Sequence, residues 1–200
     1  MKSKLPYTSS IRNMPLMFSE MKRTALLLCE GKTTDEILQL SIEKNIYQFE
    51  KEKRRREVAF RMTKRLSTIN KPLIELLANN NGVEAKLVTF LAFMKADRLL
   101  FEYMVEVYSD KFHAGFEDVT DIDFIDFFNR KAQNCETVAK WSAEILKDLR
   151  SAIKKTLVTA ELAKRTKNGF LILKPLLCEN ICTLLDETDR VYARAMLLEV

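Results

Sequence analysis

The residues of this chain with the clearest chemistry are positively charged and lie close together. The fifteen residues 51–65 hold eight lysines and arginines against two glutamates. Guanidinium and ammonium groups bind phosphate oxygens through charge-assisted hydrogen bonds, so the run indicates a surface for a polyanion. A second interpretation stays open, because a basic run is also typical of a solvated helix face whose charges pair with nearby glutamates.

The periodicity of the same run predicts a helix with two different faces. Apolar residues recur at the three- and four-residue steps of one helix face, namely Val58, Ala59, Met62, Leu66 and Ile69. Four cations are expected on the opposite side: Arg54, Arg61, Lys64 and Arg65. A helix holds such charges in fixed positions, whereas a flexible tail would lose more conformational entropy on binding.

A second basic segment lies near the end of the chain. Residues 140–174 carry nine basic and three acidic side chains, and the acidic stretch 118–126 separates them from the first segment. A helix is expected over 142–163, and Asn168-Gly169 predicts a β-hairpin within 164–174. A helix followed directly by a basic hairpin is the layout of a winged helix, although a small hairpin that covers the end of a core fits equally well.

These two segments predict contacts with the phosphate backbone of a nucleic acid that do not depend on its base sequence. Few aromatic or amide side chains lie among the cations, which favours phosphate contacts over base readout or base stacking. The first predicted surface comprises Lys53, Arg54, Arg55, Arg56, Arg61, Lys64 and Arg65, and the second comprises Lys154, Lys155, Lys164, Arg165 and Lys167.

The sequence gives no sign of catalysis, and we predict a protein that is not an enzyme and has no cofactor. The four glycines are scattered, so no phosphate-binding glycine loop is present, and the single histidine, His113, excludes most catalytic triads. The cysteines are too dispersed for a zinc site and are expected as free thiols: Cys29, Cys135, Cys178 and Cys182.

The composition predicts an all-α multi-helix bundle with one small β-hairpin near its C-terminal part. Hydrophobic residues make up 47% of the 200 residues, but four Gly and four Pro provide few turns for a large sheet. The longest apolar run, residues 87–94, is too short to span a bilayer, and residues 1–4 do not begin a secretory signal. We therefore expect a soluble, cytoplasmic protein with no membrane partner.

The expected helices divide the chain into two domains. We predict an N-terminal helical domain over 1–117, which contains the basic helix, and a C-terminal helical domain over 118–200, which contains the winged-helix-like hairpin. In the first, a helix over 16–30 ends at a glycine turn, a short helix follows, and the basic helix over 49–68 comes third. This order is that of a helix-turn-helix unit with a recognition helix, and many three-helix bundles share it.

Three further features of the expected elements can be compared with a structure. Thr33 and Glu36 form a capping-box pattern, Thr120 is expected to cap the helix over 121–132, and a strongly apolar helix over 83–112 is expected at the core, with an interruption at Asp97-Arg98. Two last helices are expected near 176–185 and 188–198.

The order and spacing of several short segments resemble the BrxA family of bacteriophage exclusion (BREX) defence systems, over about residues 7–198. The segments that carry the likeness are Tyr7-Thr-Ser-Ser10, Pro15-Leu-Met-Phe18, Glu20, the turn that ends at Gly31, Asp35-Glu36-Ile37, Asn45-Ile-Tyr-Gln48, Arg54-Arg55-Arg56, Arg65-Leu66, Asp97-Arg98-Leu99-Leu100, Phe127-Phe128, Trp141-Ser142 and Leu173-Lys174-Pro175-Leu176-Leu177. Members of this family were earlier described as a domain of unknown function and as inner-membrane proteins, a description that the missing membrane span does not support.

The resemblance implies a small, non-enzymatic DNA-binding component of a phage-resistance system, with a fold likened to the RNA-binding factor NusB. Its partners would be double-stranded DNA and other BREX components, namely a methyltransferase, an ATPase and a phosphatase-like protein. Two alternatives stay open: a helical assembly subunit whose basic helix docks on an acidic partner, and an RNA-binding NusB-like factor.

Overall fold

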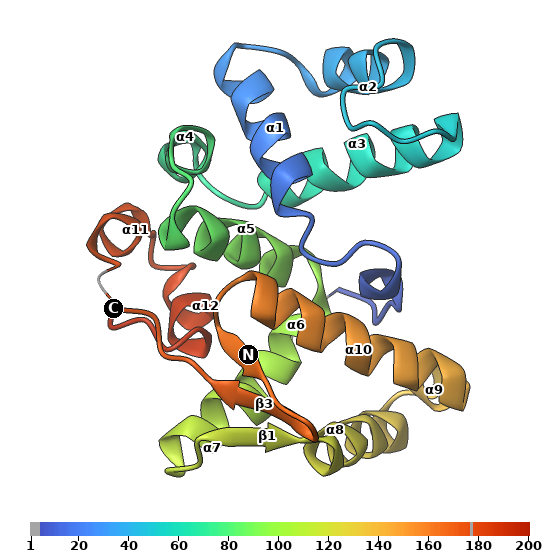
Figure 1. Ribbon diagram of the computed structural model, residues 1–200, viewed down its shortest axis with the longest axis vertical. Helices are drawn as coiled ribbons and strands as arrows, with labels where there is room; N and C mark the ends of the chain where they lie inside the picture. Colours follow the sequence, from blue (N-terminus) through green and yellow to red (C-terminus); the bar gives the residue numbers. More distant parts are fainter. Residues whose placement is uncertain (1–4, 177) are drawn as a thin grey trace. The chain divides into compact units, whose positions relative to one another are not determined.

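The chain divides into two compact units in the computed structural model, which describes residues 5–176 and 178–200 (Figure 1). Met17–Ala96 form one unit, here called the continuous unit. The described residues up to Leu16 join Asp97–Val200 in the other, here called the split unit. The boundary expected at 117/118 therefore falls inside the split unit, and the chain changes unit at Asp97 instead. Residues 1–4 lie outside the described residues, and so does the expectation that they begin no secretory signal. Leu177, which falls in the helix expected over 176–185, also lies outside them.

The continuous unit is built from helices alone. They are α1 (Phe18–Cys29), α2 (Thr34–Glu43), α3 (Glu52–Leu66), α4 (Lys71–Asn79) and α5 (Val83–Ala96). α1 packs against α3, α4 and α5, and α2 packs against α3. The apolar residues of α5 are buried from Leu87 to Met94, which confirms the prediction of a core helix in this part of the chain.

The start of α2 follows the capping-box prediction. The Glu36 amide donates to Thr33 Oγ1 at 3.2 Å, and the Thr33 amide donates to Glu36 Oε2 at 2.8 Å, so two amides at the helix start are satisfied. Hydrogen bonds from the backbone and hydroxyl of Thr33 keep the pKa of Glu36 below its ordinary value. Gly31, after α1, has φ +83°, a conformation that glycine adopts without the steric cost of a Cβ.

The expected core helix over 83–112 is interrupted at Asp97, as its sequence predicts. The Leu100 amide donates to Asp97 Oδ1 at 3.0 Å, so Asp97 caps a new helix, α6 (Arg98–Tyr103). A π-helical segment, η2 (Met104–Ser109), and the short α7 (Asp110–His113) continue it.

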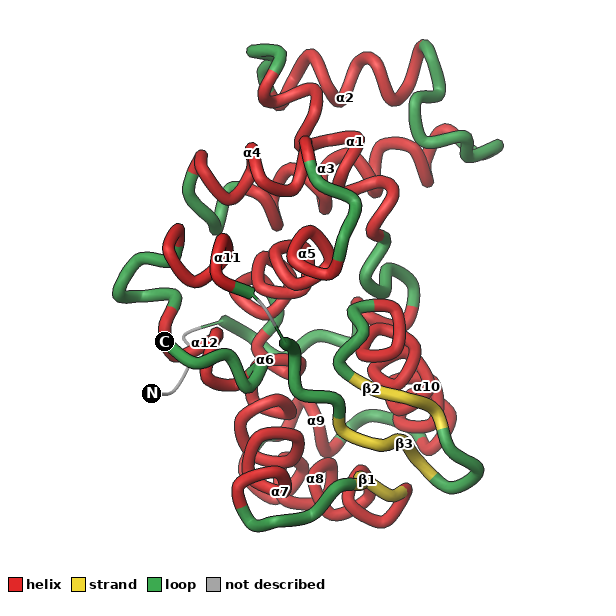
Figure 2. The backbone as a smooth tube through the Cα atoms, turned by 60° about the vertical axis from the view of Figure 1, so that its left-hand side comes forward, coloured by secondary structure: helices red, strands yellow, loops and turns green. Residues whose placement is uncertain are grey.

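The rest of the split unit combines helices with a small sheet (Figure 2). Its other elements are the 3-10 helix η1 (Ser10–Arg12), β1 (Asp118–Thr120), α8 (Asp121–Asn134), α9 (Glu136–Ala139), α10 (Ala143–Thr159), β2 (Ala163–Arg165), β3 (Gly169–Ile172), α11 (Glu179–Leu184) and α12 (Arg190–Ala195). The fold class predicted from composition, mostly helical with one small β element, is confirmed.

The sheet has three antiparallel strands in the order β1-β3-β2, one strand more than the sequence predicts. The hairpin of β2 and β3 is confirmed. Its glycine, Gly169, is needed for the close approach of a neighbouring strand and not for the turn. A Cβ on Gly169 would lie 1.9 Å from the Val119 carbonyl oxygen, so only glycine lets β1 approach β3 this closely. Thr120 pairs with Gly169 in this register.

The end of β1 leads directly into α8 through a second capping box. The Thr120 amide donates to Asp123 Oδ2 at 2.7 Å, which confirms Thr120 as the cap of this helix. Although partial burial opposes ionisation, hydrogen bonds from Lys111 and Thr120 keep the pKa of Asp123 below its ordinary value. β1 and α8 are therefore fixed to each other and to α7.

Aromatic rings join the helices of the split unit to its sheet. Tyr103 of α6 stacks on Phe124 of α8 at a centroid distance of 4.8 Å, and the edge of Phe127 approaches it at 5.3 Å. Phe124 in turn meets Phe170 of β3 at 6.2 Å, edge to face. Offset and edge-to-face ring pairs stabilise a core beyond the area they bury.

One buried hydroxyl ties the strand ends to the helical core, and it yields a stability prediction. Tyr108 Oη lies 2.7 Å from the Leu162 carbonyl oxygen and 2.9 Å from that of Leu173, and donates its proton to these acceptors. We expect Tyr108→Phe to lower the free energy of unfolding by about 1–2 kcal/mol, because buried acceptors lose a donor that water does not replace. Urea denaturation measures the loss.

Tyr192→Phe is the matched control, since the Tyr192 hydroxyl forms no hydrogen bond to any described residue. Its free energy of unfolding is expected within about 0.5 kcal/mol of the parent. Equal losses in the two variants would show that the Tyr108 hydrogen bonds do not stabilise the sheet.

Candidate nucleic-acid interface

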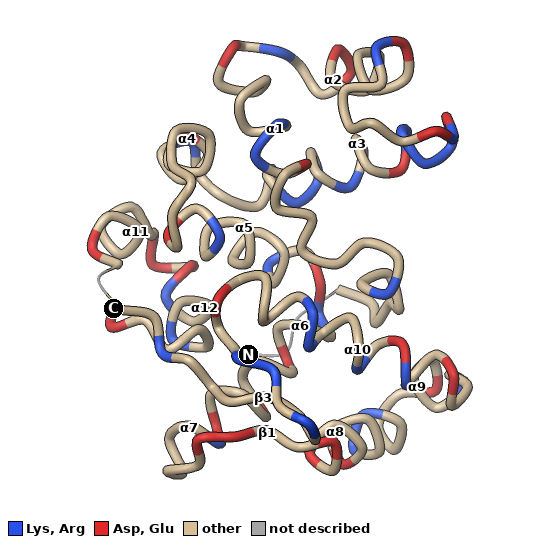
Figure 3. The backbone as a smooth tube through the Cα atoms, viewed as in Figure 1, with Lys and Arg blue, Asp and Glu red and all other residues tan. Residues whose placement is uncertain are grey.

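β2 and the loop between β2 and β3 carry three exposed cations. Residues 164–168 are all exposed, and they include Lys164, Arg165 and Lys167. None of these three side chains has a hydrogen bond or ion pair to another described residue. Figure 3 shows basic positions following β2 and its turn. All three cations are therefore available to an external anion.

The hairpin is held in place by the antiparallel pairing of its two strands, β2 and β3. Arg165 lies opposite Phe170, and Lys164 lies opposite Leu171, in the antiparallel pairing of β2 with β3. Phe170 is fully buried, so it anchors β3 while the basic side chains of β2 stay in solvent. The loop is thus an extension of a packed sheet and not a free tail.

α10 presents further cations next to this hairpin, since β2 packs against it. Its buried side is formed by Leu149, Ile153 and Leu157, whereas Lys147 and Lys155 are exposed. These two lysines also have no side-chain partner among the described residues. We call the set Lys147, Lys155, Lys164, Arg165 and Lys167 the wing surface.

Lys154 was predicted to belong to this surface, but it serves the interior instead. Its ammonium group pairs with the Asp121 carboxylate and lies 5.4 Å from the centroid of the Phe124 ring. Only 13% of the side chain is exposed. Arg150 lies 3.6 Å from the same carboxylate, so both cations fix α10 to the start of α8.

The acidic side chains of α10 limit how strongly it can attract phosphate. Asp148 is exposed but forms an ion pair with Arg12 of η1 at 3.3 Å. Glu144, in the first turn, is exposed and has no partner among the described residues. The part of α10 that attracts phosphate therefore begins at Lys147 and continues toward β2.

α3, in the continuous unit, contains the other predicted surface, and two of its arginines face inward. Arg65 is 3% exposed, and its guanidinium lies 3.5 Å from the centroid of the Phe93 ring of α5. The prediction that Arg65 points away from the apolar stripe is wrong, because it lies three residues after Met62 on the buried side. Burial of this cation over an aromatic face is a stabilising arrangement.

Arg55 is also committed to the fold. Its guanidinium donates to the carbonyl oxygens of Ile42 at 2.9 Å, Phe49 at 2.6 Å and Glu50 at 3.0 Å. These carbonyls belong to the end of α2 and to the loop before α3. A phosphate ligand would have to replace three internal acceptors, so Arg55 is a structural residue.

The remaining cations of α3 fall into two groups. Arg54 lies 3.8 Å from Glu57, and Arg56 lies 2.8 Å from Glu52. Exposed pairs of this kind contribute little and exchange readily for other partners. Lys53, Arg61 and Lys64 have no side-chain partner among the described residues. We call these last three the α3 surface.

In the part of the chain that the structure describes, no metal site or membrane-spanning helix accompanies these surfaces. Within residues 5–176 and 178–200, no three His, Cys, Asp or Glu side chains form a group that could hold a metal ion. The helices of these described segments are too short or too polar to cross a bilayer. The cysteines that they contain are free thiols.

Among the described residues, a helical protein emerges in which the α3 surface and the wing surface, which combines α10 with a β-hairpin, each hold cations without a side-chain partner. Comparison with known proteins then identifies its family: residues 5–189 match BrxA. The chain belongs to the BrxA family. It is 35% identical over 171 residues to "BREX protein BrxA" from Bacillus cereus (strain H3081.97), a match that covers 86% of each chain.

A solved structure shows the same fold. The crystal structure of an uncharacterized protein from Magnetospirillum magneticum superposes with a TM-score of 0.77 and covers 95% of this chain and 97% of its own. The two sequences are 21% identical, so the likeness concerns the fold alone.

The contrast between Arg65, which is buried, and Arg61, which has no side-chain partner among the described residues, leads to a prediction about stability. Arg65→Met is expected to lower the free energy of unfolding by about 1–3 kcal/mol, because it removes the desolvated cation–π contact with Phe93. Arg61→Met on the same helix is expected to change it by less than about 0.5 kcal/mol. Parallel chemical denaturation of both variants measures the difference, and similar values would contradict the buried role of Arg65.

Proposed function

We propose that this protein acts in a BREX phage-defence system by binding the backbone of double-stranded DNA through its wing surface. The main support is that these five cations are exposed and have no internal partner among the described residues. Unpaired surface cations on a fixed scaffold attract phosphates without first giving up an existing ion pair.

The topology of the split unit supports the same proposal. The order β1, α8, α9, α10, β2 and β3, with the sheet order β1-β3-β2, resembles that of a winged helix-turn-helix. In such an arrangement the second helix of the motif, here α10, lies in the major groove, and the wing lies against the neighbouring backbone. This step rests on fold-level analogy, whereas the cations rest on this chain's own residues.

The chemistry of the wing surface favours phosphate contacts over reading of bases. Four of its five members are lysines, which act on phosphate as compact charges, and Arg165 alone provides a planar donor fork. Binding is therefore expected to tolerate many sequences and to weaken steeply as salt rises.

The α3 surface is a separate candidate for the same role, and the main proposal does not require it. Lys53, Arg61 and Lys64 have no side-chain partner among the described residues, whereas Arg55 and Arg65 serve the interior. Replacing Arg54, Arg55 and Arg56 together would disturb the fold as well as the charge, so it is a poor test of this surface.

An assembly role is the second candidate function, and an exposed apolar pair favours it. Ile122 and Ile125 of α8 are 68% and 50% exposed. Neighbouring apolar side chains of this exposure are typical of protein contact surfaces. The family membership makes other BREX components the natural partners.

A gel-shift titration of duplex DNA at several salt concentrations tests the main proposal. Five neutralised phosphates predict a slope of log affinity against log salt of about −4.5 for the parent protein. The triple variant Lys164→Ala, Arg165→Ala, Lys167→Ala is expected to reduce the slope to about −2. Because these side chains have no internal partners, the circular dichroism spectrum and melting temperature are expected to stay unchanged.

The matched control is Lys53→Ala, Arg61→Ala, Lys64→Ala, which removes the same charge from the other unit. An equal loss in both triple variants would mean that both surfaces bind DNA. No change of slope in the wing variant would contradict the main proposal. Duplex RNA and single strands in the same assay separate DNA binding from RNA binding.

A further inference from the structure

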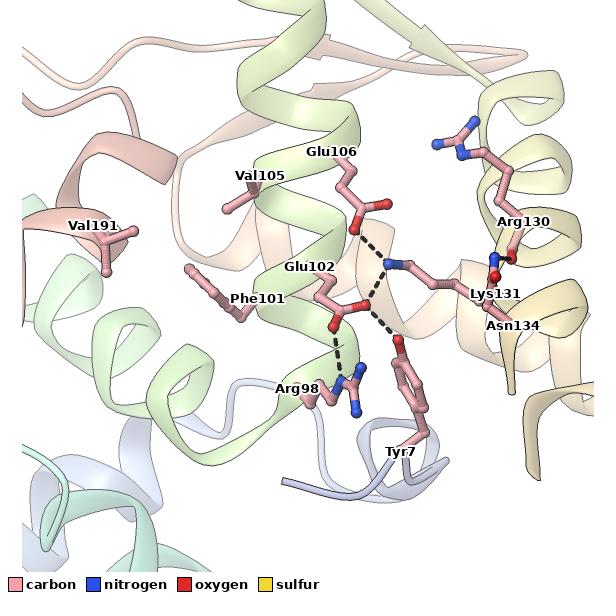
Figure 4. A pocket seen from close by; sticks show the side chains of 10 residues that line it. All are labelled: Tyr7, Arg98, Phe101, Glu102, Val105, Glu106, Arg130, Lys131, Asn134 and Val191. Atoms are coloured by element: carbon pink, nitrogen blue, oxygen red, sulfur yellow. Dashed lines mark hydrogen bonds and ion pairs between the residues drawn. The ribbon is translucent and has the colours of Figure 1, made fainter. Parts of the chain in front are cut away.

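A cavity of about 590 Å³ lies within the split unit, and none of its lining residues belongs to the wing surface (Figure 4). Its walls come from the N-terminal segment at Tyr7, from α6 and η2, from the end of α8, and from Val191 of α12. Segments far apart in sequence therefore converge here, including Tyr7-Thr-Ser-Ser10 and Asp97-Arg98-Leu99-Leu100. The DNA-binding proposal assigns no role to either.

The floor of the cavity is a carboxylate that three donors hold in place. Glu102 accepts from Tyr7 Oη at 2.6 Å, from Arg98 Nε at 2.7 Å and from the ammonium of Lys131. Glu102 is 8% exposed and Lys131 is 9% exposed. Although burial opposes its ionisation, hydrogen bonds from Lys131, Tyr7 and Arg98 keep the pKa of Glu102 below its ordinary value.

The donors around Glu102 are themselves fixed. The Arg98 guanidinium lies 4.0 Å from the centroid of the Tyr7 ring, and its Nη1 donates to the Leu5 carbonyl oxygen at 3.4 Å. Lys131 also pairs with Glu106. Rigid, desolvated groups of this kind are already oriented before a ligand arrives, which lowers the entropy lost on binding.

Most of the hydrogen-bonding groups around the cavity that are not already used are donors. Arg130 is exposed, projects from α8 beside Lys131 in Figure 4, and has no hydrogen bond or ion pair from its side chain to the described residues. Three cations, Arg98, Arg130 and Lys131, line the cavity with two carboxylates, Glu102 and Glu106. Since Lys131 bridges both carboxylates, the charge that remains unmatched is positive, and an anion would complete it.

The other half of the cavity is apolar. Val105 and Val191 are 40% and 38% exposed, and Phe101 lies beside them. In the view of Figure 4 these side chains lie to the left of the helix and Glu106 and Lys131 lie to its right, so the cavity runs across the helix face between them. Val105 and Glu106 both belong to the π-helical turn η2, and such turns are frequent at functional sites because they widen the helix and redirect side chains.

We propose that this cavity binds an organic anion, a carboxylate or phosphate group joined to an apolar body. The guanidinium fork of Arg130 holds the anionic group, in the bidentate geometry that suits both carboxylates and phosphates. The apolar body covers Val105 and Val191. The anion is carried either by a small molecule or by the carboxy-terminal residue of a peptide, which share this chemistry.

The test is a titration of the ¹⁵N-labelled full chain, followed by amide chemical shifts. Phenyl phosphate joins both halves of the proposed ligand, and inorganic phosphate provides the anion alone. We expect phenyl phosphate to shift the amides of η2 and the end of α8 with a Kd on the order of 1 mM, which is usual for a ligand of this size. Inorganic phosphate is expected to bind at least about tenfold more weakly, because it leaves the valines exposed.

Two variants locate the binding. Arg130→Ala is expected to weaken phenyl phosphate at least about tenfold, since a charge-assisted bidentate contact is lost. Arg194→Ala removes another exposed arginine of the same unit, one that does not line the cavity, and is expected to leave binding unchanged. N-acetylphenylalanine and its amide test which molecule carries the anion. Binding of the acid but not of its amide supports the carboxy-terminal residue of a peptide. Binding of phenyl phosphate without binding of N-acetylphenylalanine supports a phosphorylated small molecule.

The proposal is overturned if no localised shifts occur with any of these probes, or if inorganic and phenyl phosphate bind equally and Arg130→Ala has no effect. DNA binding by the Arg130→Ala variant serves as a separate readout. It is expected to match the parent, so failure of this site and failure of the DNA-binding proposal are distinguishable.

Discussion

The cost of burying a charge without a partner decides which cations of this protein are available to a ligand. A guanidinium that faces a helix interface must find carbonyl, carboxylate or aromatic partners there, because desolvation of an unpaired charge costs several kcal/mol. Arg55 meets this requirement with three backbone carbonyls, and Arg65 meets it with the face of Phe93. Lys154 does the same at Asp121. The cations left over, and not the density of charge along the sequence, define the surfaces that we propose for DNA binding.

Part of this division was predictable from helical spacing. Arg55, Val58, Met62, Arg65 and Ile69 follow one another at three- and four-residue steps, so both arginines lie on the apolar stripe that predicts the buried face. The capping boxes at Thr33 and Thr120 and the break at Asp97 were predictable for a similar reason, because each depends on residues three or four positions apart.

The features that could not be predicted depend on contacts between distant parts of the chain. β1 is three residues long and lies in an acidic stretch, and only its pairing with β3, about fifty residues later, makes it a strand. The Glu102 cluster likewise joins Tyr7, Arg98 and Lys131 across more than a hundred residues. No local pattern marks Glu102 as a buried carboxylate, because an Arg–Glu pair at four-residue spacing, such as Arg98 and Glu102, is also typical of exposed helices.

The discontinuous course of the split unit has a consequence for synthesis of the protein. Tyr7 meets Glu102, Ser10 Oγ lies 3.4 Å from Asp97 Oδ2, and Arg12 meets Asp148, so the first segment finds its partners only after the eighty residues of the continuous unit have been made. The continuous unit consists of consecutive helices with largely local contacts, which form early and quickly on an emerging chain. Its folding fixes residues 17 and 96 relative to each other and removes the conformational freedom of the connection between the two parts of the split unit. We therefore expect the ribosome to release a chain whose middle is folded before its two ends join.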